Sequence, residues 1–241
     1  MTITAGAELH FQKLNDAIRE SRDREITVQN CLGQRYIGAG LSEKTVTIEG
    51  TPGNALGAYL DGAEIYVRGN AQDAVGDTMN AGSIVVYGNG GDAVGYAMRG
   101  GKIFIRDNAG YRVGIHMKAY KENKPVVVIG GKCGSFLGEY QAGGIIAVLG
   151  LTEDDRPIVG NFCGTGMHGG EMYLRTDKLP ALLPKQVRAE KLERIEGGEI
   201  ADILRAYCKQ FGLDEKEILN HPFYKLTPDS ENQYRRMYTN N

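Results

Sequence analysis

The chain has 241 residues, a formal net charge of −2 and 41% hydrophobic residues, which is enough for a sizeable core. The balanced charge argues against a nucleic-acid-binding surface, and no apolar run approaches the roughly 18 residues of a membrane helix. The N-terminus lacks the apolar region of a signal peptide. The four cysteines form no CxxC pair. We therefore expect reduced thiols, no zinc or iron–sulfur site, and a cytoplasmic location.

Residues 1–25 are expected to form a short helical cap. Phe11, Leu14 and Ile18 are spaced three and four residues apart, which is typical of one face of a helix. Such a helix would cover the first layer of the structure that follows, because the open end of a stacked sheet exposes apolar surface and an unpaired strand edge.

Residues 26–176 repeat with a period close to 19. Segments starting at Val46, Ile65, Ile84 and Ile103 follow one another every 19 residues, and each opens with two aliphatic residues spaced by two. A fixed period of this size predicts a solenoid. Later copies contain insertions and an earlier copy is poorer, so that eight segments align, with starts at Ile26, Val46, Ile65, Ile84, Ile103, Val126, Ile146 and Met172.

The repeat unit predicts a parallel β-helix. Two aliphatics at spacing two lie on one face of a strand, and stacked coils would bury them in a continuous column. No coil contains a helix-period stretch. Glycines near the eleventh position after each start are expected at the corners, where positive φ or close backbone approach excludes a Cβ. These structural glycines are Gly57, Gly76, Gly95, Gly114, Gly138 and Gly160.

Several polar and glycine-rich features invite a functional interpretation. The run after Gly88 resembles a phosphate-binding loop, but no helix N-terminus or Lys-Ser/Thr follows, which favours corner glycines. Asp73 and Asp92 recur at equivalent positions, yet calcium-binding repeats need a carboxylate pattern in every turn. Hydrogen bonding within turns is therefore the favoured role of these aspartates.

His116, His168 and Cys163 invite interpretation as a metal site or a Cys–His nucleophile pair. Their spacing matches no ligand motif, and no acidic residue that would orient a histidine lies at a fixed offset. Structural or interface histidines and a small core cysteine are the favoured interpretation, so we assign no catalytic, cofactor-binding or metal-ligating residue to this chain.

Side chains that point away from the aliphatic column predict a second packing surface. In the middle and later coils these outward positions are apolar, and a folded chain does not leave such a patch bare. Residues 177–241 carry an amphipathic helix from Ile200 to Phe211 that stops at Gly212, so we expect this tail to cover the patch. A partner subunit is the alternative cover. The predicted face consists of Val85, Tyr87, Phe104, Val127, Ile129 and Leu149.

If the tail covers that face, partner chains are expected at the glycine corners and at the Met117–Pro125 insertion. This insertion and the acidic insertion Leu151–Ile158 are expected to project outward, because irregular charged backbone belongs at the surface.

Long sequence words in order resemble the GXGXG domain that forms the C-terminal part of the large subunit of glutamate synthase. The resemblance spans roughly residues 6–176, and the C-terminal helices also look like the stand-alone form of that domain. The words are Gly33–Gly40 (GQRYIGAG), Pro52–Asn54 (PGN), Gly69–Gly76 (GNAQDAVG), Gly95–Gly101 (GYAMRGG), Gly110–Met117 (GYRVGIHM), Phe136–Tyr140 (FLGEY) and Gly164–Gly170 (GTGMHGG).

The resemblance implies a right-handed β-helix with an architectural role. In that family glutaminase chemistry uses an N-terminal cysteine nucleophile, and reduction occurs on FMN beside an iron–sulfur cluster in other domains. This chain has no cysteine before Cys31 and no cluster spacing or flavin-phosphate motif. The implied partners are separate amidotransferase, FMN-binding and ferredoxin-like subunits, which would carry those cofactors; a homo-oligomer is also compatible.

Two other classes of function compete with this interpretation. A solenoid acyltransferase would repeat an aliphatic every six residues, which the 19-residue period does not match. The other class is a scaffold or binding module of another complex. Such a module would be a relative of the repeat-containing subunit of formylmethanofuran dehydrogenase, which shares the repeat but lacks most of the words quoted above.

Overall fold

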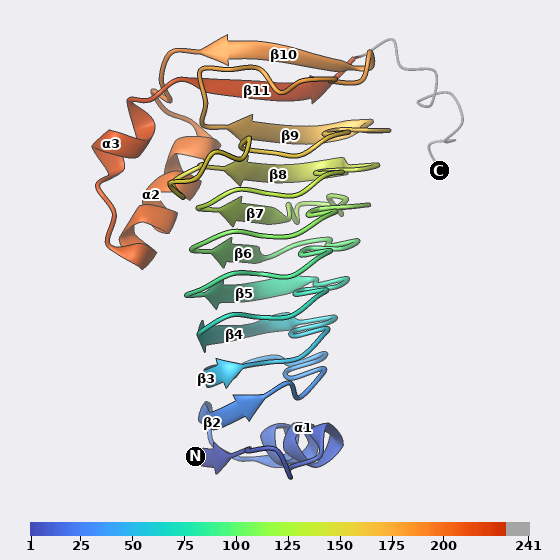
Figure 1. The fold of residues 1–241 in the computed structure, drawn as a ribbon. Coiled ribbons are helices and arrows are strands. Elements are labelled where there is room, and N and C mark those ends of the chain that lie inside the picture. Colours follow the sequence, from blue (N-terminus) through green and yellow to red (C-terminus); the bar gives the residue numbers. More distant parts are fainter. Residues whose placement is uncertain (230–241) are drawn as a thin grey trace.

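One continuous sheet runs through the computed structural model, which describes residues 1–229 (Figure 1). Within these residues eleven strands lie side by side, in the order β1 to β9, then β11, then β10. Each strand from β1 to β9 pairs in parallel with the next along the chain, whereas β11 pairs antiparallel with both β9 and β10. The chain is therefore mainly β, as predicted, and the stack fits a solenoid-like fold.

Turns rather than helices join the strands from β2 to β9. The strands of this stretch and the one before it are β1 (Thr2–Thr4), β2 (Glu25–Leu32), β3 (Thr45–Thr51), β4 (Asp61–Arg68), β5 (Ala81–Val86), β6 (Lys102–Ile105), β7 (Val126–Ile129), β8 (Ala142–Val148) and β9 (Gly169–Leu174). The flanking elements are α1 (Phe11–Glu20), β10 (Val187–Leu192), α2 (Glu199–Phe211), α3 (Glu215–Leu219) and β11 (Phe223–Pro228).

The strand register stacks the aliphatic pairs of successive coils. Ile65 pairs with Ile84, and Ile84 pairs with Ile103, so the first aliphatic of each coil lies directly beside the next. All three side chains are fully buried. Corner residues such as Val75 and Met79 close the other sides of the same interior core. A stack of this kind buries apolar area that a single coil could not bury alone.

The register at β7 corrects the predicted coil boundary by one residue. Ile103 pairs with Val127, and Ile105 pairs with Ile129, so Val127 and Ile129 face the interior core and do not belong to the outer packing face. The coil start therefore lies 24 residues after Ile103 rather than 23. Four consecutive aliphatic residues show no polar alternation, and a slip of one residue exchanges the two faces of a strand.

The N-terminal segment contains both a strand and the expected helix. Helix α1 begins after His10, whose side chain accepts a hydrogen bond from the backbone N–H of Gln12, as in a helix N-cap. Leu14 and Ile18 of α1 are buried in the interior core. Strand β1 pairs with β2 in parallel, so the first coil is covered by backbone pairing as well as by the helix.

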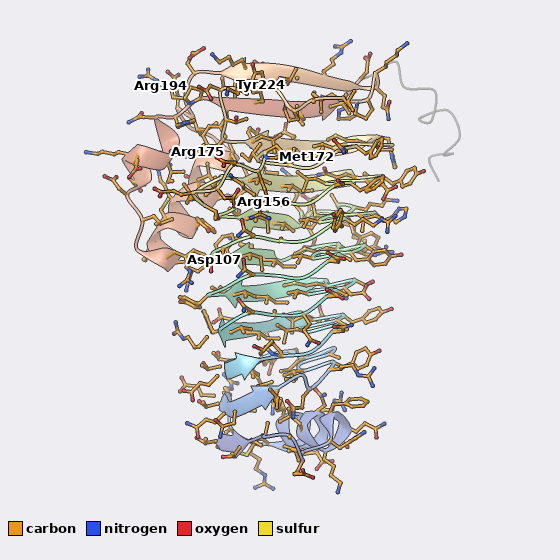
Figure 2. The ribbon with its side chains drawn as sticks, viewed as in Figure 1. Asp107, Arg156, Met172, Arg175, Arg194 and Tyr224 are labelled. Carbon is orange, nitrogen blue, oxygen red and sulfur yellow. The ribbon has the colours of Figure 1, made fainter. Side chains whose placement is uncertain are left out.

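The C-terminal segment returns to the sheet instead of only wrapping around it. Helices α2 and α3 lie beside the later strands, and β11 then pairs with β9, where Leu226 lies opposite Met172 (Figures 1 and 2). The prediction of a linker over residues 177–198 missed β10, whose charged alternation hides its strand character. The predicted extended stretch from His221 holds β11, and its end at Tyr238 lies outside the described residues.

Candidate functional site

The coil corners share a left-handed glycine. The φ angles are +63° at Gly57, +67° at Gly76, +70° at Gly95, +69° at Gly114 and +61° at Gly138. In the last coil the equivalent residue is Gly164, with φ +73°, and Gly160 is not among the positive-φ residues. The seven-residue insertion before this corner moved the glycine, since Met172 follows Ile146 by 26 residues rather than 19.

The space beneath a corner glycine is already filled. A Cβ on Gly57 would lie 2.5 Å from Cδ1 of Ile84, a core residue of the following coil. A Cβ in the left-handed region also costs roughly 1–2 kcal/mol for an L residue. Both steric reasons coincide at these corners, so the glycines are structural.

Bulky residues share the left-handed conformation beside the later corner glycines. Phe136 and Phe162 stand two residues before their glycines, with φ of +64° and +62°. His116 and Tyr140 stand two residues after theirs, with φ of +55° and +53°. Left-handed backbone at non-glycine residues is strained, and such strain gathers where a side chain serves a function. Earlier coils hold alanine at several equivalent positions, including Ala74 and Ala93.

These residues form an exposed surface, the aromatic corner surface. The ring of His116 stacks on Tyr140 with a centroid distance of 5.2 Å and an interplanar angle of 7°, and Tyr96 meets His116 edge-on. Phe136 stacks on Phe162 at 5.0 Å. Tyr140 is 43% exposed and Phe162 is 49% exposed. We define the surface as Tyr96, Arg112, His116, Phe136, Tyr140 and Phe162, with the Arg112 guanidinium 5.2 Å from the Phe136 ring centroid.

The sequence predicted partners at the corners without singling out these residues. The signal is present in the sequence, because an aromatic residue stands two positions from the corner glycine in the words Phe136–Tyr140 and Gly110–Met117. The two-residue offset identifies an exposed column only when both flanking positions are left-handed and point outward, which is a backbone property.

The predicted outer packing face is covered by the chain's own tail. Val85, Phe104 and Leu149 are buried in a second hydrophobic cluster that includes α2 and α3 residues. Tyr87 is half-buried, and its hydroxyl accepts a 2.6 Å hydrogen bond from Gln210. In place of Val127 and Ile129, the outward residues of β7 are Val126 and Val128, which belong to this cluster.

Cys163 and the two histidines are not gathered into one site. Cys163 is 2% exposed in the interior core, and burial raises the pKa of its thiol to about 12, so little thiolate exists near neutral pH. His116 lies outside, on the aromatic corner surface. His168 is half-buried, with Nδ1 3.1 Å from the carbonyl oxygen of Gly166.

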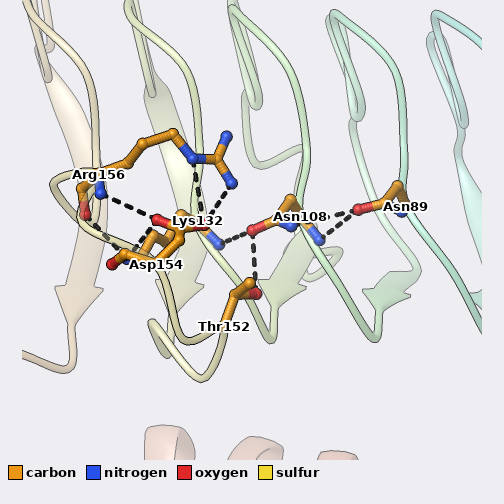
Figure 3. Close-up of polar contacts among 6 residues, drawn as sticks. All are labelled: Asn89, Asn108, Lys132, Thr152, Asp154 and Arg156. Carbon is orange, nitrogen blue, oxygen red and sulfur yellow. Dashed lines mark hydrogen bonds and ion pairs between the residues drawn. The ribbon is translucent and has the colours of Figure 1, made fainter.

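Polar ladders bind neighbouring coils to each other (Figure 3). Oδ1 of Asn89 accepts hydrogen bonds from the backbone N–H and the side-chain amide of Asn108, and Asn70 serves Asn89 in the same way. Oδ1 of Asp73 accepts from the backbone N–H of Asp92 at 2.9 Å, and Asp92 accepts from Tyr111. The recurring Asp73 and Asp92 therefore satisfy backbone donors of the next coil, in keeping with the turn role favoured for them.

The ladder ends in a charged cluster on the acidic insertion. Nζ of Lys132 donates to Oδ1 of Asp154 at 2.7 Å and to the carbonyl oxygens of Asp154 and Arg156 at 2.5 and 2.8 Å (Figure 3). Arg156 reaches the second oxygen of Asp154 at 2.7 Å. Lys132 is buried, and its three donors are all used. The cluster ties the insertion to the adjacent coil.

Stability at acid pH should depend on Asp154. Hydrogen bonds from Arg156, then from Lys132, hold the pKa of the Asp154 carboxyl well below its ordinary value of 3.8. A lowered folded-state pKa contributes stability above pH 4 that is lost as the pH falls below that value. We expect the melting temperature of Asp154→Asn to be lower than wild type at pH 7, with a gap that narrows in more acid buffer. Melting curves from pH 7 to pH 3 check this, and a constant gap would contradict it.

Residues 1–229 offer neither a membrane span nor a metal site. No helix there is long and apolar enough to cross a membrane. Over the same residues, no three His, Cys, Asp or Glu side chains are grouped so that they could hold a metal ion.

Comparisons with known proteins agree with the repeat. The GXGXG motif family model matches residues 11–229. An uncharacterized protein of Methanocaldococcus jannaschii is 43% identical over 250 residues, covering 96% of this chain and 94% of that protein. A chain of the formyltransferase/hydrolase complex of Methylorubrum extorquens, solved with methylofuran, matches with a TM-score of 0.63 and 20% identity, over 85% of this chain and 74% of that chain. That identity shows a shared fold alone, whereas the family match spans most of the chain: it belongs to the GXGXG motif family.

Proposed function

We propose that this chain is a non-catalytic assembly subunit of a multi-chain oxidoreductase complex, and that the complex is a glutamate synthase. Separate amidotransferase, FMN-binding and ferredoxin-like chains would supply the nucleophile, the flavin and the iron–sulfur cluster, in the cytoplasm. Family membership and the sequence words shared with the glutamate synthase domain support this proposal. We further infer that the coils wind as a right-handed β-helix, in agreement with that resemblance.

The aromatic corner surface carries the proposal. Aromatic residues and arginine are enriched in the buried centre of protein interfaces, because they supply large contact areas. Phe136, Tyr140 and Phe162 keep bulky rings at left-handed positions, where the earlier coils hold alanine or glycine at lower steric cost. Retaining that strain on an exposed surface favours a role in contact with another protein. The occupant is a separate subunit of the complex, since the tail of this chain already covers the outer face of β5 to β9.

A double substitution tests the docking surface. Tyr140→Asn with Phe162→Asn should leave the free energy of unfolding nearly unchanged, because asparagine tolerates left-handed backbone. The affinity for the partner should fall by roughly 30-fold or more, which corresponds to the loss of an interface hot spot. Leu182→Asn is the matched control, since Leu182 is 73% exposed and also left-handed but lies outside the corners. Calorimetric titration with the amidotransferase and FMN-binding chains of the same organism provides the measurement.

Activity of the assembled complex distinguishes glutamate synthase from the alternative. Addition of this chain should be needed for glutamine-dependent formation of glutamate from 2-oxoglutarate by the partner chains. The alternative is a scaffold of a formyl-transferring complex, favoured only by the fold shared with the formyltransferase/hydrolase complex. Equal binding by the double variant would reject the docking surface, and a stable complex without glutamate formation would reject the glutamate synthase assignment.

A further inference from the structure

A cavity of about 400 Å³ lies between the acidic insertion and the segment that follows β9. Its wall is basic: Lys132, Arg156, Arg175 and Lys178 contribute cationic side chains, and Asp155 is the acidic residue among the lining side chains. Arg175 follows the last residue of β9, and Arg156 lies on the insertion before that strand (Figure 2). The cavity therefore joins two segments that the coil brings together.

Two of the four cations already have their counter-charge. Asp154 binds Lys132 through one carboxylate oxygen and Arg156 through the other. Arg175 and Lys178 take part in none of the salt bridges found among residues 1–229. Positive charge thus exceeds negative charge around the cavity.

Arg175 is poorly satisfied for a partly buried guanidinium. Its Nε is buried and has no hydrogen-bond partner within the described chain, and Nη1 makes one long bond of 3.4 Å to the carbonyl oxygen of Leu149. Burial lowers the pKa of Arg175, and Glu217 opposes this only through a longer-range attraction. A cation removed from water without a counter-ion is costly, and a buried polar group of this kind requires an explanation such as an ion.

We propose that this cavity binds a small organic oxyanion, a carboxylate or a phosphate ester, with Arg175 as its principal contact. A guanidinium presents a planar fork that matches two oxygens of either group. Lys178 adds a second positive charge at the exposed side, while Ile158 and Pro180 offer apolar contact to the carbon part of the ligand. The site is independent of the aromatic corner surface, so it stands or falls separately from the proposed function.

Calorimetric titration of the full chain with inorganic phosphate and with succinate tests the site. Wild type should bind at least one probe, and the probe that binds shows whether the site accepts phosphate or carboxylate. Arg175→Gln should weaken binding about tenfold or more, because a charge-assisted contact is lost. Lys178→Gln, an exposed position where folding is not at risk, should weaken it by a smaller factor.

Arg106→Gln is the matched control. Arg106 follows Ile105 just as Arg175 follows Leu174, but it is half exposed and pairs with Asp107 at 2.9 Å, so binding should be unchanged. In anion-free buffer Arg175→Gln should be at least as stable as wild type, since it removes an unpaired charge. Failure of wild type to bind either probe, equal binding by Arg175→Gln, an equal loss in Arg106→Gln, or destabilisation of Arg175→Gln without anion would each overturn the site.

Discussion

Tyr207→Ala is expected to lower the free energy of unfolding by about 3–5 kcal/mol, in the range of large-to-small core substitutions. Tyr207 of α2 is fully buried against the outer face of the sheet. Its ring meets Phe104 edge-on at a centroid distance of 5.4 Å, and its hydroxyl donates a 3.0 Å hydrogen bond to the carbonyl oxygen of Ile105. Removing the side chain leaves a cavity and an uncovered apolar strip. Urea unfolding followed by circular dichroism measures the change.

Two further variants separate packing from the hydrogen bond. Tyr207→Phe keeps the ring contacts and should cost about 1 kcal/mol, the usual net value of one hydrogen bond. Tyr111→Ala removes a tyrosine that is 56% exposed, and should change the free energy of unfolding by less than about 0.5 kcal/mol. If Tyr207→Ala were as mild as Tyr111→Ala, the tail would not cover the outer face in solution.

Gly76→Ala is expected to cost about 2–4 kcal/mol. The left-handed backbone at φ +67° accounts for roughly 1–2 kcal/mol of this cost. Overpacking adds typically 1–3 kcal/mol, because the new methyl group would overlap Cδ1 of Ile103 in the following coil. The loss should appear in the urea midpoint with little change in the slope, since the folded structure is retained.

Gly197→Ala provides the control for this substitution. Gly197 has no positive φ, and a Cβ there would meet no atom within 4 Å, so its stability should be near that of wild type. Ala74→Gly offers the converse test at the same corner, because Ala74 already has φ +59°. That change should leave the free energy of unfolding within about 1 kcal/mol of wild type. A mild effect of Gly76→Ala alongside these controls would mean that the corner can open.

The coil architecture was readable from the sequence because one physical constraint repeats every 19 residues. A strand buries alternate side chains, and a corner needs glycine where no Cβ fits, so Ile65 with Gly76 and Ile84 with Gly95 mark successive coils. The same reasoning found the outward apolar positions Val85 and Phe104 and the amphipathic helix that covers them. These features depend on local spacing, which the chain carries without reference to its neighbours.

Only the tertiary structure decided the features that depend on which coil lies beside which residue. The run Val126–Ile129 satisfies either register, and only its pairing with β6 sends Val127 and Ile129 inward. Likewise, Gly164 rather than Gly160 takes the corner because the insertion is accommodated before the turn. Arg175 and the insertion around Arg156 lie far apart along the chain and share a cavity only through stacking. Local periodicity thus determined the elements, whereas contacts across coils determined the charged cavity and the aromatic corner surface.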